Sequence, residues 1–123
     1  MSEEIEITIE ELRESFDGRA ESRGFKFLQM DKTDTGYIYR VNSGTKPHYE
    51  IFERRTAKKI ESFNPTTLSE TERREIYPNR NVFGKSAWTT GNYERAQDIL
   101  AEIESTVEAR IKNKARRNAK AGN

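Results

Sequence analysis

The sequence predicts an α+β domain in which a long helix packs on a small antiparallel sheet. Three observations carry this prediction: a helix-period apolar stripe near the C-terminus, short segments of alternating apolar residues between turn formers, and a set of six Phe, five Tyr and one Trp. Only 33% of the residues are hydrophobic and 35% are charged, so the core is lean and depends on its aromatic side chains. The length is that of one domain, which we assign to residues 1–114.

An N-terminal helix is the first predicted element. Thr8 and Glu11 match a capping box, because the Thr8 side chain can accept the Glu11 amide while Glu11 reaches back. Gly24 is a natural left-handed stop for this helix. Its expected apolar face consists of Ile9, Leu12, Phe16 and Ala20.

The period then changes to two, which is typical of strands. We expect strands over 25–30, 37–41, 48–55 and 58–63, separated by short turns. Connections this short favour an antiparallel meander of three to four strands. One face of this sheet, which includes Tyr37, Tyr39 and Val41, is apolar enough to receive helices, and the other is expected to be mixed and wet.

Residues 64–81 break the strand pattern and are predicted to form a surface excursion between Pro65 and Pro78. Ser69 and Glu72 have the spacing that caps a short helix within it. A short last strand at 86–89 then carries Trp88.

The long helix is expected from Asn92 to about Lys114, capped by Thr90 or Asn92. The apolar stripe of this helix must pack against another surface of the protein. It consists of Ala96, Ile99, Leu100, Ile103, Val107 and Ile111. We expect residues 115–123 to be a basic, frayed tail. The predicted core contains Phe16, Phe83, Trp88, Ile99, Leu100 and Ile103.

The charges are distributed unevenly along a chain whose net charge is only +1. Residues 1–17 contain seven acids and one base, whereas 110–120 contain six bases and no acid. Such ends can attract each other across a fold or attract other molecules. The absence of Cys excludes disulfides and thiol chemistry, and the acidic start lacks the pattern of a signal peptide. We expect a cytoplasmic protein with no membrane segment and no cofactor.

Sequence support for an enzyme is limited to His48 and Glu50, which lie two residues apart and therefore on one strand face. A metal site normally needs a third ligand, and no second His and no Cys exists. The Gly84-Lys85-Ser86 tripeptide is not a P-loop, because position 79 is Asn rather than Gly. We expect no enzymatic activity.

Nucleic-acid binding is one function class that remains open. A small sheet that carries aromatic residues, with basic residues nearby, can stack on nucleobases and contact phosphates. The aromatic residues are Tyr37, Tyr39, Tyr49 and Phe52. Against it, the chain has no signature of a known nucleic-acid-binding motif. The candidate residues are Arg40, Arg55, Lys58, Lys59, Arg110, Lys112, Lys114, Arg116 and Arg117.

The segments His48-Tyr49-Glu50-Ile51-Phe52-Glu53-Arg54 and Phe83-Gly84-Lys85-Ser86-Ala87-Trp88 resemble those of small uncharacterised proteins of bacteriophages, prophages and mobile elements. The resemblance covers about residues 36–103. It implies a one-domain α+β accessory protein of the phage type, located in the host cytoplasm, and such proteins often act by binding a host or phage protein.

Binding to another protein is the leading functional prediction. The expected surfaces are the mixed sheet face, the 64–81 excursion and the exposed part of the long helix. A homodimer formed through that helix is a second version of the same hypothesis, because the stripe extends further than one small sheet can cover. The candidate protein-binding residues are Tyr49, Phe52, Arg54 and Ile111.

Overall fold

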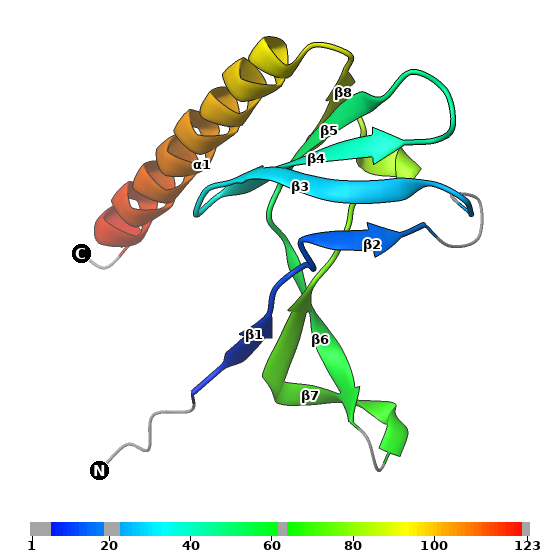
Figure 1. Cartoon of the computed structure of the whole chain (residues 1–123). Coiled ribbons are helices and arrows are strands. Elements are labelled where there is room, and N and C mark those ends of the chain that lie inside the picture. The colour runs from blue at the N-terminus through cyan, green and yellow to red at the C-terminus, as the bar shows by residue number, and fades with distance from the viewer. Residues whose placement is uncertain (1–5, 19–22, 62–63, 122–123) are drawn as a thin grey trace.

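The computed structural model describes residues 6–18, 23–61 and 64–121, with side chains described only outside 61–66 and 118–121. It confirms the α+β class, with two sheets and one long C-terminal helix (Figure 1). A five-stranded antiparallel sheet has the order β2-β3-β4-β5-β8. Its strands are β2 (Ser15–Asp17), β3 (Lys26–Lys32), β4 (Gly36–Asn42), β5 (His48–Glu53) and β8 (Ala87–Thr90).

A second sheet of three strands projects from the first, and we call it the arm (Figure 1). It consists of β1 (Thr8–Glu10), β6 (Thr56–Glu61) and β7 (Asn64–Glu75), in the order β1-β7-β6. β6 and β7 form an antiparallel hairpin, and β1 joins β7 in parallel. Its described residues include no buried apolar side chain, since only Ser69 and Glu75 are buried.

The long helix α1 (Tyr93–Ala121) packs on one face of the five-stranded sheet, over β4, β5 and β8. Ile38 and Ile51 from the sheet meet Ala96, Ile99, Leu100 and Ile103 from the helix. The approach is close at Gly36, where an added Cβ would lie 2.7 Å from Leu100 Cδ1. The Asn92 side chain accepts the Arg95 amide at 3.1 Å, which confirms one of the two predicted caps.

The opposite face of this sheet carries the aromatic cluster and is covered by the link between β7 and β8 rather than by α1. Phe27, Tyr37, Tyr39 and Phe52 are buried there, and Phe16 stacks on Phe27 with ring centroids 4.8 Å apart. Tyr77, Val82 and Phe83 close the cluster from the link between β7 and β8, which contains the short 3₁₀ helix η2 (Arg80–Val82). The expectation of one wet, mixed face is therefore wrong, because both faces are covered at β4 and β5.

The predicted N-terminal helix is not present. Two short strands, β1 and β2, replace it over the described residues, while Ala20 lies outside them. Ile5, Ile7 and Ile9 alternate with polar residues, which is a strand period, and this alternation prevails over the capping-box match at Thr8.

The 64–81 segment also differs from its prediction. A long strand, β7, occupies most of it, and no short helix forms at Ser69. The Ser69 hydroxyl does accept the Thr71 and Glu72 amides, at 3.3 and 3.0 Å, as a capping side chain would. These bonds instead accompany an irregular stretch in the pairing of β6 with β7. The predicted strands and the position of Trp88 on the last strand are confirmed with small shifts of their bounds. The strand expected at 58–63 is β6, which belongs to the arm and is not a fourth strand of the meander.

The predicted core is confirmed on α1, where Ile99, Leu100 and Ile103 are buried. Phe16, Phe83 and Trp88 are partly buried and pack against the two clusters. The helix continues past the predicted end near Lys114 to Ala121, so residues 115–121 are helical rather than frayed. Within the described ranges, no helix has the length and apolarity needed to cross a bilayer.

Candidate functional site

The four residues predicted to bind a protein have different surroundings. Phe52 is buried in the aromatic cluster, and Tyr49 packs against Tyr93 of α1 with ring centroids 5.2 Å apart. Arg54 is engaged in ion pairs at the base of the arm. Ile111 alone is exposed, which leaves a single apolar residue uncovered at the end of the helix stripe.

The arm is joined to the body by a group of charged residues that we call the clamp: Glu11, Lys32, Arg54 and Glu75. Glu75 ends β7, and its side chain is only 3% exposed. Its Oε2 accepts from Arg54 Nε at 2.6 Å, while its Oε1 accepts from the Tyr37 hydroxyl and, at 3.1 Å, from the Leu12 amide. Arg54 also donates to Glu11 at 2.6 Å. The clamp therefore satisfies a buried carboxylate and fixes where the arm leaves the sheet.

The acidic N-terminal segment is neutralised by bases of neighbouring strands. Glu10 pairs with Lys59 at 2.9 Å and Glu11 with Lys32 at 2.7 Å. Lys59 lowers the pKa of Glu10, and Lys32 lowers that of Glu11. Within the described residues, no ion pair joins this segment to the basic end of α1. The basic helix end is therefore left without these acids as partners.

The residues predicted to contact nucleic acid fall into two groups. Three lie near the start of the arm and pair with acids, since Arg55 contacts Glu53, Lys58 contacts Glu70 and Lys59 contacts Glu10. The others lie on β4 and α1 and consist of Arg40, Arg110, Lys112, Lys114, Arg116 and Arg117. Because Tyr37, Tyr39 and Phe52 are buried, they cannot stack on bases, and the predicted aromatic platform is not formed.

His48 and Glu50 share a face as their spacing predicts, and His48 Nε2 lies 3.0 Å from Glu50 Oε2. The other oxygen of Glu50 accepts from the Tyr77 hydroxyl at 2.6 Å. Both carboxylate oxygens are thereby used, and the contact ties β5 to the segment after β7. No three metal-ligating side chains converge within the described ranges.

Tyr77 supplies a test of this contact at alkaline pH. Burial, and then the charge of Glu50, raise the pKa of Tyr77. In the unfolded chain, a tyrosine ionises near pH 10. Above about pH 10 the folded chain therefore binds more protons than the unfolded chain, and the free energy of unfolding falls as pH rises. We expect Tyr77→Phe to make this decline shallower and to cost about 1.5–3 kcal/mol at pH 7, where the charged hydrogen bond is lost. Urea unfolding of both proteins between pH 7 and 11 measures this, and parallel curves would contradict it.

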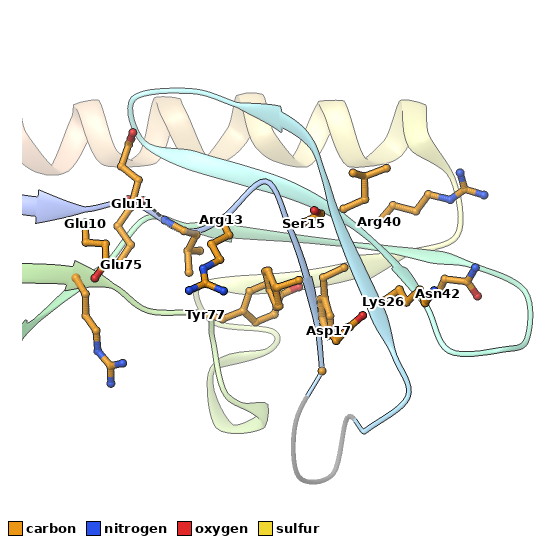
Figure 2. Close-up of a pocket in the computed structure, with 16 residues that line it drawn as sticks. Glu10, Glu11, Arg13, Ser15, Asp17, Lys26, Arg40, Asn42, Glu75 and Tyr77 are labelled. Atoms are coloured by element: carbon orange, nitrogen blue, oxygen red, sulfur yellow. Dashed lines mark hydrogen bonds between the residues drawn. The ribbon is translucent and has the colours of Figure 1, made fainter.

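An open groove surrounds β2 (Figure 2), with a volume of about 1260 Å³. This exceeds the roughly 300–1,000 Å³ of typical small-molecule pockets. Figure 2 shows Glu10, Glu11 and Glu75 near one end of the groove and Lys26, Arg40 and Asn42 near the other. Leu12, Phe16, Phe27 and Tyr77 also line the groove and supply its apolar surface. The groove therefore has the size and mixed lining of a site for a chain segment.

β2 is the edge strand of the five-stranded sheet, and within the described residues it pairs only with β3. The Gly18 amide donates to the Phe25 carbonyl, and the Gln29 amide donates to the Glu14 carbonyl. Because backbone groups alternate in direction along a strand, those of Glu14, Phe16 and Gly18 face β3. The backbone groups of Ser15 and Asp17 consequently face outward, into the space beside the groove.

The two faces of the sheet at this edge differ in chemistry. Ser15 pairs with Leu28, which pairs with Arg40, so these three side chains form a row on the α1 side. Leu28 is 48% exposed there, beyond the strands that α1 covers. On the other side lie Phe16 and Tyr77, whose rings are 5.7 Å apart. An added strand would place alternate side chains on these two surfaces.

This groove is not predicted from the sequence, because the residues between the expected cap at Thr8 and the expected stop at Gly24 are predicted to form a helix. One signal for a strand rather than a helix is the alternation of Ile5, Ile7 and Ile9 with polar residues, whereas β2 itself carries only Phe16 as an apolar residue. Comparison of the chain with protein-family models, with curated proteins and with solved structures gives no significant match.

Proposed function

We propose that this protein is a non-enzymatic accessory protein that binds another protein by adding a segment of the partner to β2 as an extra strand. The observation that carries the proposal is the outward-facing backbone of Ser15 and Asp17 beside the open groove. Addition of a strand to an open sheet edge is a recurrent mode of peptide recognition, in which backbone hydrogen bonds supply affinity. The resemblance to small phage and prophage proteins supports an accessory role in the host cytoplasm.

Side-chain specificity would come from the two surfaces beside the edge. Phe16 and Tyr77 favour an apolar or aromatic side chain on one face of the partner strand. Leu28 favours an apolar residue on the other, and Arg40 and Lys26 favour an acidic residue towards their end of the groove (Figure 2). The partner segment is therefore expected to be extended, apolar at alternate positions and acidic at one end.

Proline substitutions at the edge test this mode directly. We expect Ser15→Pro and Asp17→Pro to keep the fold, because Pro is tolerated where the amide faces away from the neighbouring strand. Each change removes one outward donor and should weaken binding of a strand-adding peptide about tenfold, or ~1.4 kcal/mol. Peptides selected from a display library against the unmodified protein, labelled and titrated by fluorescence anisotropy, provide the measurement.

Ser15→Ala is the matched control, since it removes the side-chain hydroxyl and keeps the backbone amide. Its affinity for the selected peptides should stay within about threefold of the unmodified protein, within ~0.6 kcal/mol. Circular dichroism of all three variants establishes that the sheet and α1 are retained. Peptides that bind the proline variants as tightly as the unmodified protein, or a selection without any binder, would refute strand addition at β2.

A further inference from the structure

The last turns of α1 extend beyond the sheet on which the helix packs (Figure 1). Val107 is the last stripe residue that packs on the core, and every side chain from Glu108 to Arg117 is exposed. Arg110 still contacts the body, through an ion pair with Glu53 at 2.7 Å. After Arg110, the described side chains make no ion pair. This part of α1, residues 110–120, is called the basic segment below.

The charge of the basic segment is of one sign. It contains six basic residues and no acidic residue. The basic residues that follow Arg110 and have described side chains are all exposed, namely Lys112, Lys114, Arg116 and Arg117. The helix dipole favours cations only in the last turn, whereas these bases span about three turns. Bases four residues apart, such as Lys112 and Arg116, repel each other and weaken an isolated helix. A helix that projects without packing and carries such repulsion would be stabilised by a polyanion.

The bases also surround much of the helix. At about 100° per residue, the five of them whose side chains are described, from Arg110 to Arg117, occupy an arc of about 200°. The remaining arc contains small or apolar residues such as Ile111 and Ala115. A cationic surface this wide can contact phosphates on both sides of a groove, and the apolar arc is too small to insert into a membrane interface.

We propose that the basic segment binds duplex DNA through its phosphate backbone, with the helix lying in the major groove. A helix with its side chains is about 10–12 Å across, and the major groove of B-DNA is about 12 Å wide. The major groove of an RNA duplex is too narrow for it. Single strands are usually held by exposed aromatic rings, and here Tyr37, Tyr39 and Phe52 are buried. This surface is on a different element from the β2 edge and does not depend on the peptide-binding proposal.

Salt dependence of binding to a labelled DNA duplex of mixed sequence is the first part of the test. If four basic side chains contact phosphates, the logarithm of the binding constant should fall with the logarithm of salt concentration with a slope of about −3.6. Affinity should then drop about 150-fold between 50 and 200 mM salt. Replacing Lys112, Lys114, Arg116 and Arg117 together with Gln should remove detectable binding at 50 mM salt.

A matched control has the same change in charge elsewhere on the surface. Arg23, Lys46, Lys85 and Arg95 are all exposed and also comprise two Lys and two Arg. Their replacement with Gln should change DNA affinity by less than about threefold. Circular dichroism of both variants should show the helix retained. Equal losses in the two variants would mean that total charge, rather than the basic segment, determines binding, and would overturn the proposal.

Three further ligands separate duplex DNA from other polyanions. Duplex RNA, polyglutamate and vesicles containing phosphatidylserine should each bind at least tenfold more weakly than duplex DNA at the same salt concentration. Absence of DNA binding at 50 mM salt would overturn the proposal. Equal or tighter binding of any of the three alternatives would also overturn it, because the groove fit would then play no part.

Discussion

Glu75→Ala is expected to lower the free energy of unfolding by about 3–5 kcal/mol, the typical cost of breaking a buried ion pair from one side. The substitution leaves the Arg54 guanidinium, which lies 5.0 Å from the centre of the Tyr37 ring, without its buried carboxylate. It also removes the acceptor of the Tyr37 hydroxyl and of the Leu12 amide. Urea unfolding followed by tryptophan fluorescence and circular dichroism measures the change.

Glu70→Ala is the matched control for this substitution. Glu70 lies on the same strand and pairs with Lys58 at 2.9 Å, but its side chain is 78% exposed. Exposed pairs contribute about 0–1 kcal/mol, so Glu70→Ala should remain within about 1 kcal/mol of the unmodified protein. If the two substitutions have similar effects, the clamp does not hold the arm to the body.

Ile103→Ala is expected to cost about 2–5 kcal/mol, because it removes a buried side chain between α1 and the sheet. Ile103 is 4% exposed and packs in the cluster that contains Ile38 and Ile51. The cavity would lie under the middle of the helix, where Leu100 also approaches Gly36. Equilibrium unfolding in urea gives the loss directly.

Ile111→Ala makes the same chemical change two helical turns later, where the side chain is 62% exposed. Its effect should lie within about 0.5 kcal/mol of zero. This pair of variants locates the point at which α1 ceases to belong to the core. Comparable losses from Ile103→Ala and Ile111→Ala would show that the basic segment is packed, which contradicts its assignment as a projecting surface.

The central sheet and the long helix could be predicted from the sequence because their signals are local. Alternating residues from Tyr37 to Val41, with turn formers on both sides, identify β4, and the neighbouring strands follow in the same way. The three- and four-residue spacing from Ala96 to Val107 identifies the buried face of α1. These elements form the core, and their burial agrees with their pattern.

The arm as a separate sheet, and its strand β7, could not be predicted, because they are specified by pairings between distant segments. β7 carries charged or polar residues at most positions and has no alternating apolar pattern. Contacts with β6 and β1 hold it in place, including Lys58 with Glu70 and the Arg73 guanidinium with Thr56. A local sequence pattern carries no information about pairings between distant segments. Because the 64–81 segment has the composition of a surface loop, it is predicted to be one.

The face of the sheet on which α1 packs also could not be predicted from the sequence. Tyr37 and Tyr39 share a face that looked suited to a helix, yet α1 covers Ile38 and Ile51 on the other side. The choice depends on how segments after β5 return to the sheet, with Tyr77 and Phe83 filling the aromatic side. The candidate site at β2 follows from the same long-range arrangement, because the groove exists only where β2 and the base of the arm meet.

The central claim is that β2 has an open edge to which a partner strand adds, and residue-resolved amide hydrogen exchange tests it most directly. In the unliganded protein, the Phe16 amide should be protected by β3, whereas the Ser15 and Asp17 amides should exchange rapidly. Addition of a selected peptide should protect Ser15 and Asp17. Protection of these two amides before any peptide is added, or rapid exchange that continues after it is bound, would contradict the account.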